Sequence, residues 1–152
     1  MAQSDEQARQ HLLDLLGQAT DELAEALGAL GEAYEQLDES QGDRLEEQLF
    51  RPLQLAYGRA KATYEGFARR HGLALRELTT ASAGLPSTGV KAFVDQAVEA
   101  TGRAEAQLIT LQESPMAIEL GDPELRAGIS EVRRMIDALS RRARDFVRTF
   151  GR

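Results

Sequence analysis

Cysteine and tryptophan are absent from this chain of 152 residues. Without thiols the protein cannot form disulfides, attack a substrate with a thiolate, or hold iron–sulfur clusters and zinc through sulfur ligands. The only histidines are His11 and His71, and neither belongs to a Glu-x-x-His arrangement such as di-iron bundles use. We therefore predict that the protein holds no metal and needs no cofactor.

Long hydrophobic runs are missing as well. No segment approaches the roughly 20 apolar residues that a membrane-spanning helix requires, and residues 1–6 lack the basic and apolar regions of a signal peptide. The net charge of −7 argues against nucleic acid as a partner, because phosphate binding needs a dominant basic face. We expect a cytoplasmic protein with no nucleic-acid partner.

The sequence also lacks a catalytic arrangement. Many apolar residues recur at helical spacing and so form apolar stripes, and most of the carboxylates lie outside these stripes. We expect the carboxylates to lie on solvated faces, where nothing would raise the pKa of a carboxyl group for general acid catalysis. No strand alternation occurs, so no strand is available to precede a glycine-rich phosphate loop. We predict that the protein is not an enzyme.

Helical periodicity is what the sequence does contain. Apolar residues recur at steps of three and four, which predicts an all-α fold. We expect a single domain over residues 1–152, with helices at about 5–38, 43–72, 88–113 and 123–150. Asp43 and Asp122 are the expected N-caps of the second and fourth helices, with Pro123 at the first helical position of the fourth.

These helices predict an elongated antiparallel bundle or coiled coil of three to four long helices, broken near Pro115 to Pro123. Apolar stripes look alike whether they close within one chain or pair across a dimer, so both arrangements stay open, and we predict the homodimer. Leu73 to Leu78 could extend the second helix, whereas residues 79–86 predict a loop. We expect this segment to form a partly ordered tip.

Pro52 lies inside an otherwise unbroken stripe. A proline in a helix interior removes a backbone donor and clashes with the preceding turn, at a cost of about 3 kcal/mol. Because the stripe keeps its period from Leu45 to Phe67, we predict that Pro52 kinks one continuous helix. The alternative is that Pro52 begins a helix and that residues 43–50 form a separate short one.

Charge is segregated along the chain. Residues 1–40 hold ten acidic residues and one arginine, whereas residues 122–152 hold eight arginines and five acidic residues. Around the expected tip, six cations accompany only Glu65 and Glu77. The six are Arg59, Lys61, Arg69, Arg70, Arg76 and Lys91. They could form a solvated helix end, where cations favour the helix dipole, or a surface that docks on anionic lipid.

Three stretches resemble the first-to-second-helix region of BAR domains, namely residues 31–37, 49–53 and 60–65. In that family a Phe-x-x-Pro-Leu signature early in the second helix is followed by basic and aromatic residues. Phe50, Pro52 and Leu53 match this signature in part. The resemblance covers about residues 31–71, and the preference for arginine over lysine suits a small bacterial version of the family.

The resemblance implies a crescent-shaped homodimer that binds anionic membranes and senses or generates curvature. On this mapping the six cations are the lipid contacts, and the protein would be cytoplasmic and peripheral to the membrane. The residues leave open a different class of function, a four-helix-bundle module that binds another protein and no membrane. A helical binder of a small molecule is the third hypothesis.

Overall fold

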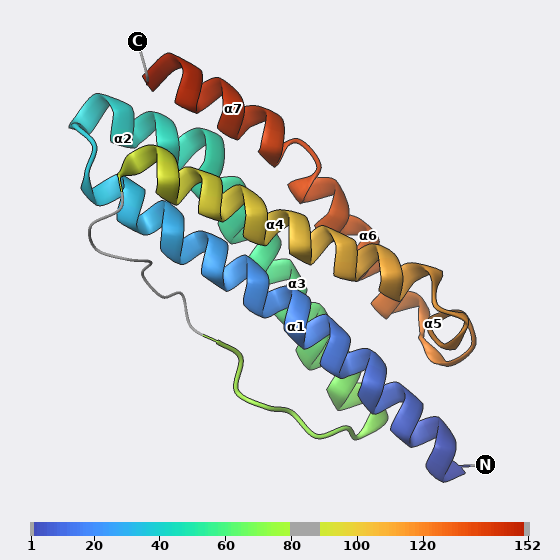
Figure 1. The fold of residues 1–152 in the computed structure, drawn as a ribbon. Helices are drawn as coiled ribbons and strands as arrows, with labels where there is room; N and C mark the ends of the chain where they lie inside the picture. Colours follow the sequence, from blue (N-terminus) through green and yellow to red (C-terminus); the bar gives the residue numbers. More distant parts are fainter. Residues whose placement is uncertain (1, 80–88, 151–152) are drawn as a thin grey trace.

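The computed structural model describes residues 2–79 and 89–150 (Figure 1). Within these ranges the chain forms helices and no strand, which confirms the all-α prediction. In chain order the elements are α1 (Ala2–Glu35), α2 (Glu39–Leu45), the π-helical turn η1 (Glu46–Phe50), α3 (Arg51–His71), α4 (Val90–Glu113), α5 (Pro115–Leu120), α6 (Pro123–Ile136) and α7 (Leu139–Phe150).

Four helical rods lie side by side: α1, α3, α4, and α6 continued by α7 (Figure 1). α1 packs mainly on α4 and α3, α3 packs on α6, and α4 packs on both α6 and α7. α3 and α4 run antiparallel to α1, whereas α6 and α7 run parallel to it. Consequently α3 ends and α4 begins at opposite ends of the molecule.

The apolar stripes of the four rods meet in one core. Leu16 of α1, Leu53 of α3, Leu108 of α4 and Phe146 of α7 are wholly buried. The long interface between α1 and α4 is rich in buried alanines on both helices, which lets the two backbones approach closely. Within the described residues, no helix is both long and apolar enough to cross a membrane.

Side chains that can cap a helix decide where α2 and α6 begin. The carboxylate of Asp38 accepts from the N–H of Gln41 at 2.8 Å, so the first break lies at residues 36–38 and the expected cap, Asp43, lies inside α2. The prediction for this boundary was wrong because the earlier carboxylate caps first. Asp122 caps α6 as predicted, accepting from the N–H of Leu125 at 2.7 Å.

The backbone stays helical through Pro52. Phe50 and Arg51 both have right-handed helical dihedral angles, and the N–H of Arg51 donates to the carbonyl of Glu46, five residues earlier. This π turn is wider than an α turn and gives the pyrrolidine ring room beside the preceding carbonyls. The helix therefore absorbs the proline by widening one turn.

Two segments differ from the sequence-based prediction. The expected helix over residues 123–150 is divided at Asp137 and Ala138, and this break lets α7 pack on α4 and η1 while α6 packs on α3. Part of the expected break between the third and fourth helices is itself helical, because Pro115 occupies the first turn of α5, where its missing N–H costs nothing.

The described part of the segment expected to form a tip, residues 73–79, does not form one, and residues 80–86 of that prediction lie outside the described residues. Gly72 adopts φ 63°, a left-handed conformation that ends the helix, and the N–H of Leu73 donates to the carbonyl of Ala68 at 2.9 Å. Residues 73–79, termed the strap, then run back along the molecule beside α1 and α3 (Figure 1). The helix does not continue because these residues bond to side chains of other helices instead.

Candidate functional site

Two side chains of α1 hold the strap. Gln10 makes two hydrogen bonds with the backbone of Ala74: its Nε2 donates to the carbonyl at 3.1 Å, and its Oε1 accepts from the N–H at 3.1 Å. Asp21 accepts from the guanidinium of Arg76 at 2.7 Å and from the N–H of Thr79 at 2.8 Å. The strap is thereby bound to α1 near both of its ends.

Tyr64 and Gly17 account for the close approach of the strap at Arg76. The phenolic oxygen of Tyr64, a buried residue of α3, accepts from the N–H of Arg76 at 3.1 Å. A Cβ atom on Gly17 would lie 2.9 Å from Nη2 of Arg76 and 3.1 Å from the ring of Tyr64. Gly17 therefore provides space for both side chains in the middle of α1.

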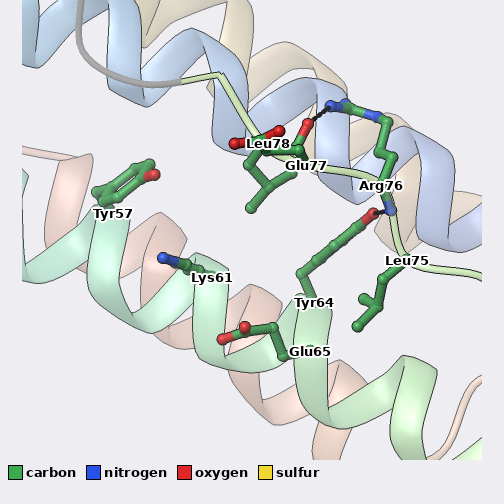
Figure 2. Close-up of a pocket in the computed structure, with 8 residues that line it drawn as sticks. All are labelled: Tyr57, Lys61, Tyr64, Glu65, Leu75, Arg76, Glu77 and Leu78. Atoms are coloured by element: carbon green, nitrogen blue, oxygen red, sulfur yellow. Dashed lines mark hydrogen bonds between the residues drawn. The ribbon is translucent and has the colours of Figure 1, made fainter.

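A pocket of about 250 Å³ opens between α3 and the strap (Figure 2). The side chain of Lys61 projects from α3 into this space (Figure 2). The lining residues are Tyr57, Lys61, Tyr64, Glu65, Leu75, Arg76, Glu77 and Leu78. Two cations and two carboxylates line the same pocket, so its charges balance and it does not select ligands of one sign.

The six cations predicted to contact lipid are spread over the molecule. Four of them are ion-paired: Arg59 with Glu131 at 2.8 Å, Arg70 with Asp122 at 2.7 Å, Arg76 with Asp21 at 2.7 Å and Lys91 with Asp95 at 2.8 Å. Lys61 and Arg69 lie exposed on α3. Arg69 lies in the last turn of α3, whereas Lys91 lies in the first turn of α4, at the opposite end of the molecule (Figure 1). The expectation of one basic tip is corrected, because α3 and α4 are not joined by a tight turn.

Asp122 is the centre of a charged cluster that joins the end of α3 to the start of α6. Arg70 donates to both of its carboxylate oxygens, at 2.7 and 2.9 Å, and Nε2 of His71 lies 2.9 Å from Oδ2. Burial alone would raise the pKa of Asp122, but the hydrogen bonds from Arg70, from the N–H of Leu125 and from His71 outweigh it and hold that pKa well below its usual range. The hydrogen bond to Asp122 also raises the pKa of Arg70. The cluster fastens two helices together.

The BAR-like signature residues occupy two different environments. Leu53 is wholly buried in the core, whereas Phe50 and Pro52 are half-buried at the surface. Phe50 lines a hollow with Gly31, Tyr34 and Glu46. Pro52 lines a second hollow, whose other lining residues are Glu47, Arg51, Leu55 and Met135. Leu53 therefore packs in the core, while Phe50 and Pro52 shape the surface.

Eight of the nine exposed residues of α3, all except Arg70, form one continuous face, termed the α3 outer stripe. Its members are Arg51, Gln54, Leu55, Gly58, Lys61, Ala62, Glu65 and Arg69, all exposed. They recur at steps of three and four, so they share one side of the helix over about 27 Å. Three cations accompany one carboxylate on this stripe, which makes it locally basic on an acidic protein.

A groove of about 290 Å³ lies between α4 and α7. Its floor is apolar and consists of Val94, Val98, Ala143 and Val147, and its edges carry Lys91, Asp95, Arg144 and Arg148. We term it the α4–α7 groove. The sequence did not predict it, because periodicity shows which face of a helix is buried but not which two helices lie side by side. The only sequence features that pointed to this groove were Val147, which lies beside the apolar stripe of the helix predicted over residues 123–150, and the arginines near the C-terminus.

Among the described residues, no group of three or more histidine or acidic side chains is arranged to hold a metal ion. No protein-family model matches the sequence, and neither a curated protein nor a solved structure matches it.

Proposed function

We propose that this protein is a non-enzymatic interaction module, a four-helix bundle that closes within one chain and binds a protein partner through its surface. The observation that carries the proposal is the burial of the apolar stripes. Leu16, Leu53, Leu108 and Phe146, which represent the four rods, are wholly buried in a single copy of the chain. A scaffold that depends on dimerisation would leave a stripe exposed until a second copy covered it.

The remaining surface supports the same proposal. Large apolar side chains that stay exposed are scattered over α1, α3, the strap and α5, namely Tyr34, Leu55, Leu75, Met116 and Ile118. Scattered residues of this kind do not make the broad apolar face of an obligate dimer. Hollows with an apolar floor and charged edges, such as the α4–α7 groove, are instead typical of sites that bind a separate protein.

Mass in solution tests the proposal. Light scattering coupled to size-exclusion chromatography should give one species of 16.7 kDa at micromolar concentration. A species of twice that mass that persists on dilution would contradict closure within one chain. It would favour the homodimer instead.

A second candidate is the membrane-binding function that the BAR resemblance implies. The α3 outer stripe favours it, because Arg51, Lys61 and Arg69 have no ion-pair partner in the part of the chain that the structure describes. Each such cation near an anionic leaflet contributes about 1 kcal/mol within a Debye length of roughly 8–10 Å. The homodimer and its curvature sensing remain part of this second candidate.

Sedimentation with vesicles tests the second candidate. If it holds, the protein should sediment with vesicles of phosphatidylcholine and phosphatidylserine, weakly with phosphatidylcholine alone, and less as salt rises. Changing Arg51, Lys61 and Arg69 to glutamate should abolish sedimentation. The matched control changes Arg134, Arg141 and Arg142, three exposed cations of α6 and α7, to glutamate. Equal loss in both variants, or no sedimentation of the unmodified protein, would exclude the α3 outer stripe as a membrane contact.

A further inference from the structure

We infer that the α4–α7 groove is the docking site for an acidic amphipathic helix of a protein partner. The inference rests on the proposed function, since it names the surface through which the interaction module binds and the chemistry of the segment that it binds. It is carried by the apolar floor of the groove, by the cations on both of its edges and by its length.

The floor of the groove is apolar, and the core beneath it has no space for a further side chain. Val98 and Val147 are only half-buried, so their methyl groups remain accessible between the two helices. Directly beneath, the space between α4 and α7 shrinks to a void of about 10 Å³, lined by core residues such as Leu30, Leu49 and Leu139. This void has room for no more than about one water molecule. An apolar side chain of a partner would therefore rest on the floor and would not enter the core.

The edges carry three cations and one carboxylate, Asp95, so their net charge is positive. Arg144 has no ion-pair partner among the described residues, Lys91 pairs with Asp95 at 2.8 Å, and Arg148 pairs with a carboxylate one turn earlier in its own helix at 2.6 Å. Both pairs lie within a single helix between largely exposed side chains, and such pairs contribute little to stability. Lys91 and Arg148 can therefore exchange these partners for carboxylates of an incoming segment. Charge complementarity thus favours an acidic ligand.

The shape favours a helix over other ligands. From Lys91 to Val98 the groove extends for about 10 Å along α4, which corresponds to about two turns of a bound helix. It is about half open to solvent, whereas pockets for small molecules enclose most of the ligand. A flat bilayer surface would touch the edges and miss a floor that lies between two helices. An amphipathic helix reaches both, with apolar anchors on the floor and carboxylates toward the edges.

A designed peptide serves as the probe. It has about 18 residues, leucines at positions i, i+3, i+4 and i+7, and glutamates beside them, and it carries a fluorophore so that anisotropy reports binding. The unmodified full-length protein should bind it saturably, and binding should weaken as salt rises. A peptide of the same composition in scrambled order, which has no apolar stripe, should bind at least tenfold more weakly.

Two double variants locate the site. Lys91→Glu with Arg144→Glu reverses one charge on each edge of the groove and should weaken peptide binding at least tenfold. Arg134→Glu with Arg142→Glu changes the net charge by the same amount at two exposed positions outside the groove and should change binding less than twofold. Circular dichroism and chromatography verify that both variants stay folded with unchanged mass. A third variant, Val98→Ser, removes apolar contact from the floor without changing charge and should also weaken binding.

The inference would be overturned by no binding of the peptide, by equal binding of the scrambled peptide, or by equal loss in both double variants. Displacement of the peptide by vesicles containing phosphatidylserine, abolished in the groove variant, would instead assign the groove to a membrane and would also overturn it. None of these outcomes alters the mass measurement. If the protein is a monomer that does not bind the peptide, the inference about the groove is wrong but the proposed interaction module is not contradicted. A stable dimer would contradict the proposed function itself.

Discussion

Gly128 of α6 lies in close contact with Thr63 of α3. A Cβ atom there would approach Cγ2 of Thr63 to 2.6 Å and would overlap its hydroxyl. Thr63 cannot easily turn away, because it is buried and its Oγ1 donates to the carbonyl of Arg59 at 2.7 Å. The backbones of the two helices can therefore lie this close only while residue 128 has no side chain.

We expect Gly128→Ala to lower the free energy of unfolding by roughly 1–3 kcal/mol, as overpacking does, although alanine is the better helix former by nearly 1 kcal/mol. Urea denaturation measures the change. Gly102→Ala is the matched control, because a Cβ at this position of α4 meets nothing within 4 Å and should stabilise the protein by about 0.4–1 kcal/mol. Equal stabilisation by both substitutions would mean that α3 and α6 are not in close contact at Thr63.

Asp122 predicts a dependence of stability on pH. Its pKa is lowered in the folded protein, so its charged form stabilises the fold at every pH above the ordinary carboxyl value of about 3.9. This stabilisation is lost as the pH falls below that value toward the lowered pKa. The groups that contact the carboxylate are Arg70, His71 and the N–H of Leu125, and Glu124 shares the guanidinium of Arg70.

We expect Asp122→Asn to lower the free energy of unfolding by about 1.5–3 kcal/mol at pH 7, the usual range for hydrogen bonds to a charged group. The difference in free energy of unfolding from the unmodified protein should narrow as the pH falls below about 4, because the carboxyl group is then protonated in the unfolded chain. Denaturation at a series of pH values provides the measurement. Glu99→Gln, at an exposed position of α4, serves as the control and should show a small difference throughout. A difference for Asp122→Asn that does not narrow in acid would exclude the ionised carboxylate as its source.

The π turn η1 is the element that accommodates Pro52. It is followed by regular α geometry in α3 and preceded by regular α geometry in α2, so the distortion is confined to residues 46–50. The physical cause is the proline itself, since its ring needs space beside a carbonyl and its nitrogen cannot donate. Replacing the proline removes both reasons for the wide turn.

We expect Pro52→Ala to keep the fold and to raise the free energy of unfolding by roughly 0.5–2 kcal/mol. Relief of an interior proline, worth up to about 3 kcal/mol, should exceed the 0.4–1 kcal/mol lost when the unfolded chain becomes more flexible. Chemical denaturation gives the total, and amide exchange of residues 48–52 shows whether an α-helical hydrogen bond has formed. A less stable variant would mean that contacts of the ring with its surface hollow outweigh the backbone effect.

At the scale of the whole molecule, oppositely charged segments meet across the helix contacts. Arg103 of α4 bonds to Glu22 at 2.9 Å and to Glu25 at 2.6 Å on the acidic α1, and Arg59 of α3 bonds to Glu131 of α6. Part of the acidic charge of α1 is therefore neutralised by cations of the strap and of α4. These pairs are exposed enough that each contributes at most about 1 kcal/mol, so they orient the rods while the apolar core stabilises them.

The proposed closure within one chain has a consequence for unfolding. It predicts that the midpoint of urea denaturation stays constant over a hundredfold range of protein concentration, because no association would be coupled to folding. An obligate dimer would unfold at higher denaturant as its concentration rises. Circular dichroism at several concentrations separates the two behaviours without reference to any partner.

Sequence alone determined the class of the fold. Steps of three and four place Leu16, Leu53, Leu108 and Phe146 on buried stripes, and all four are buried, since local periodicity is a property of the helix itself. The cap at Asp122 was also predictable, because a cap and its helix are neighbours in sequence. The choice between Asp38 and Asp43 was not, as both carboxylates could cap a helix.

Tertiary structure decided which helices pack together, and this packing in turn decided which side chains lie together on the surface. Arg69 and Lys91 are separated only by residues 70–90, and they lie at opposite ends of the molecule because the chain crosses its length between α3 and α4. Four of the six predicted lipid contacts acquire carboxylate partners, three of them from other elements of the fold. The α4–α7 groove exists only where two rods meet. Local propensity cannot encode such pairings, because they depend on the burial of the whole core at once.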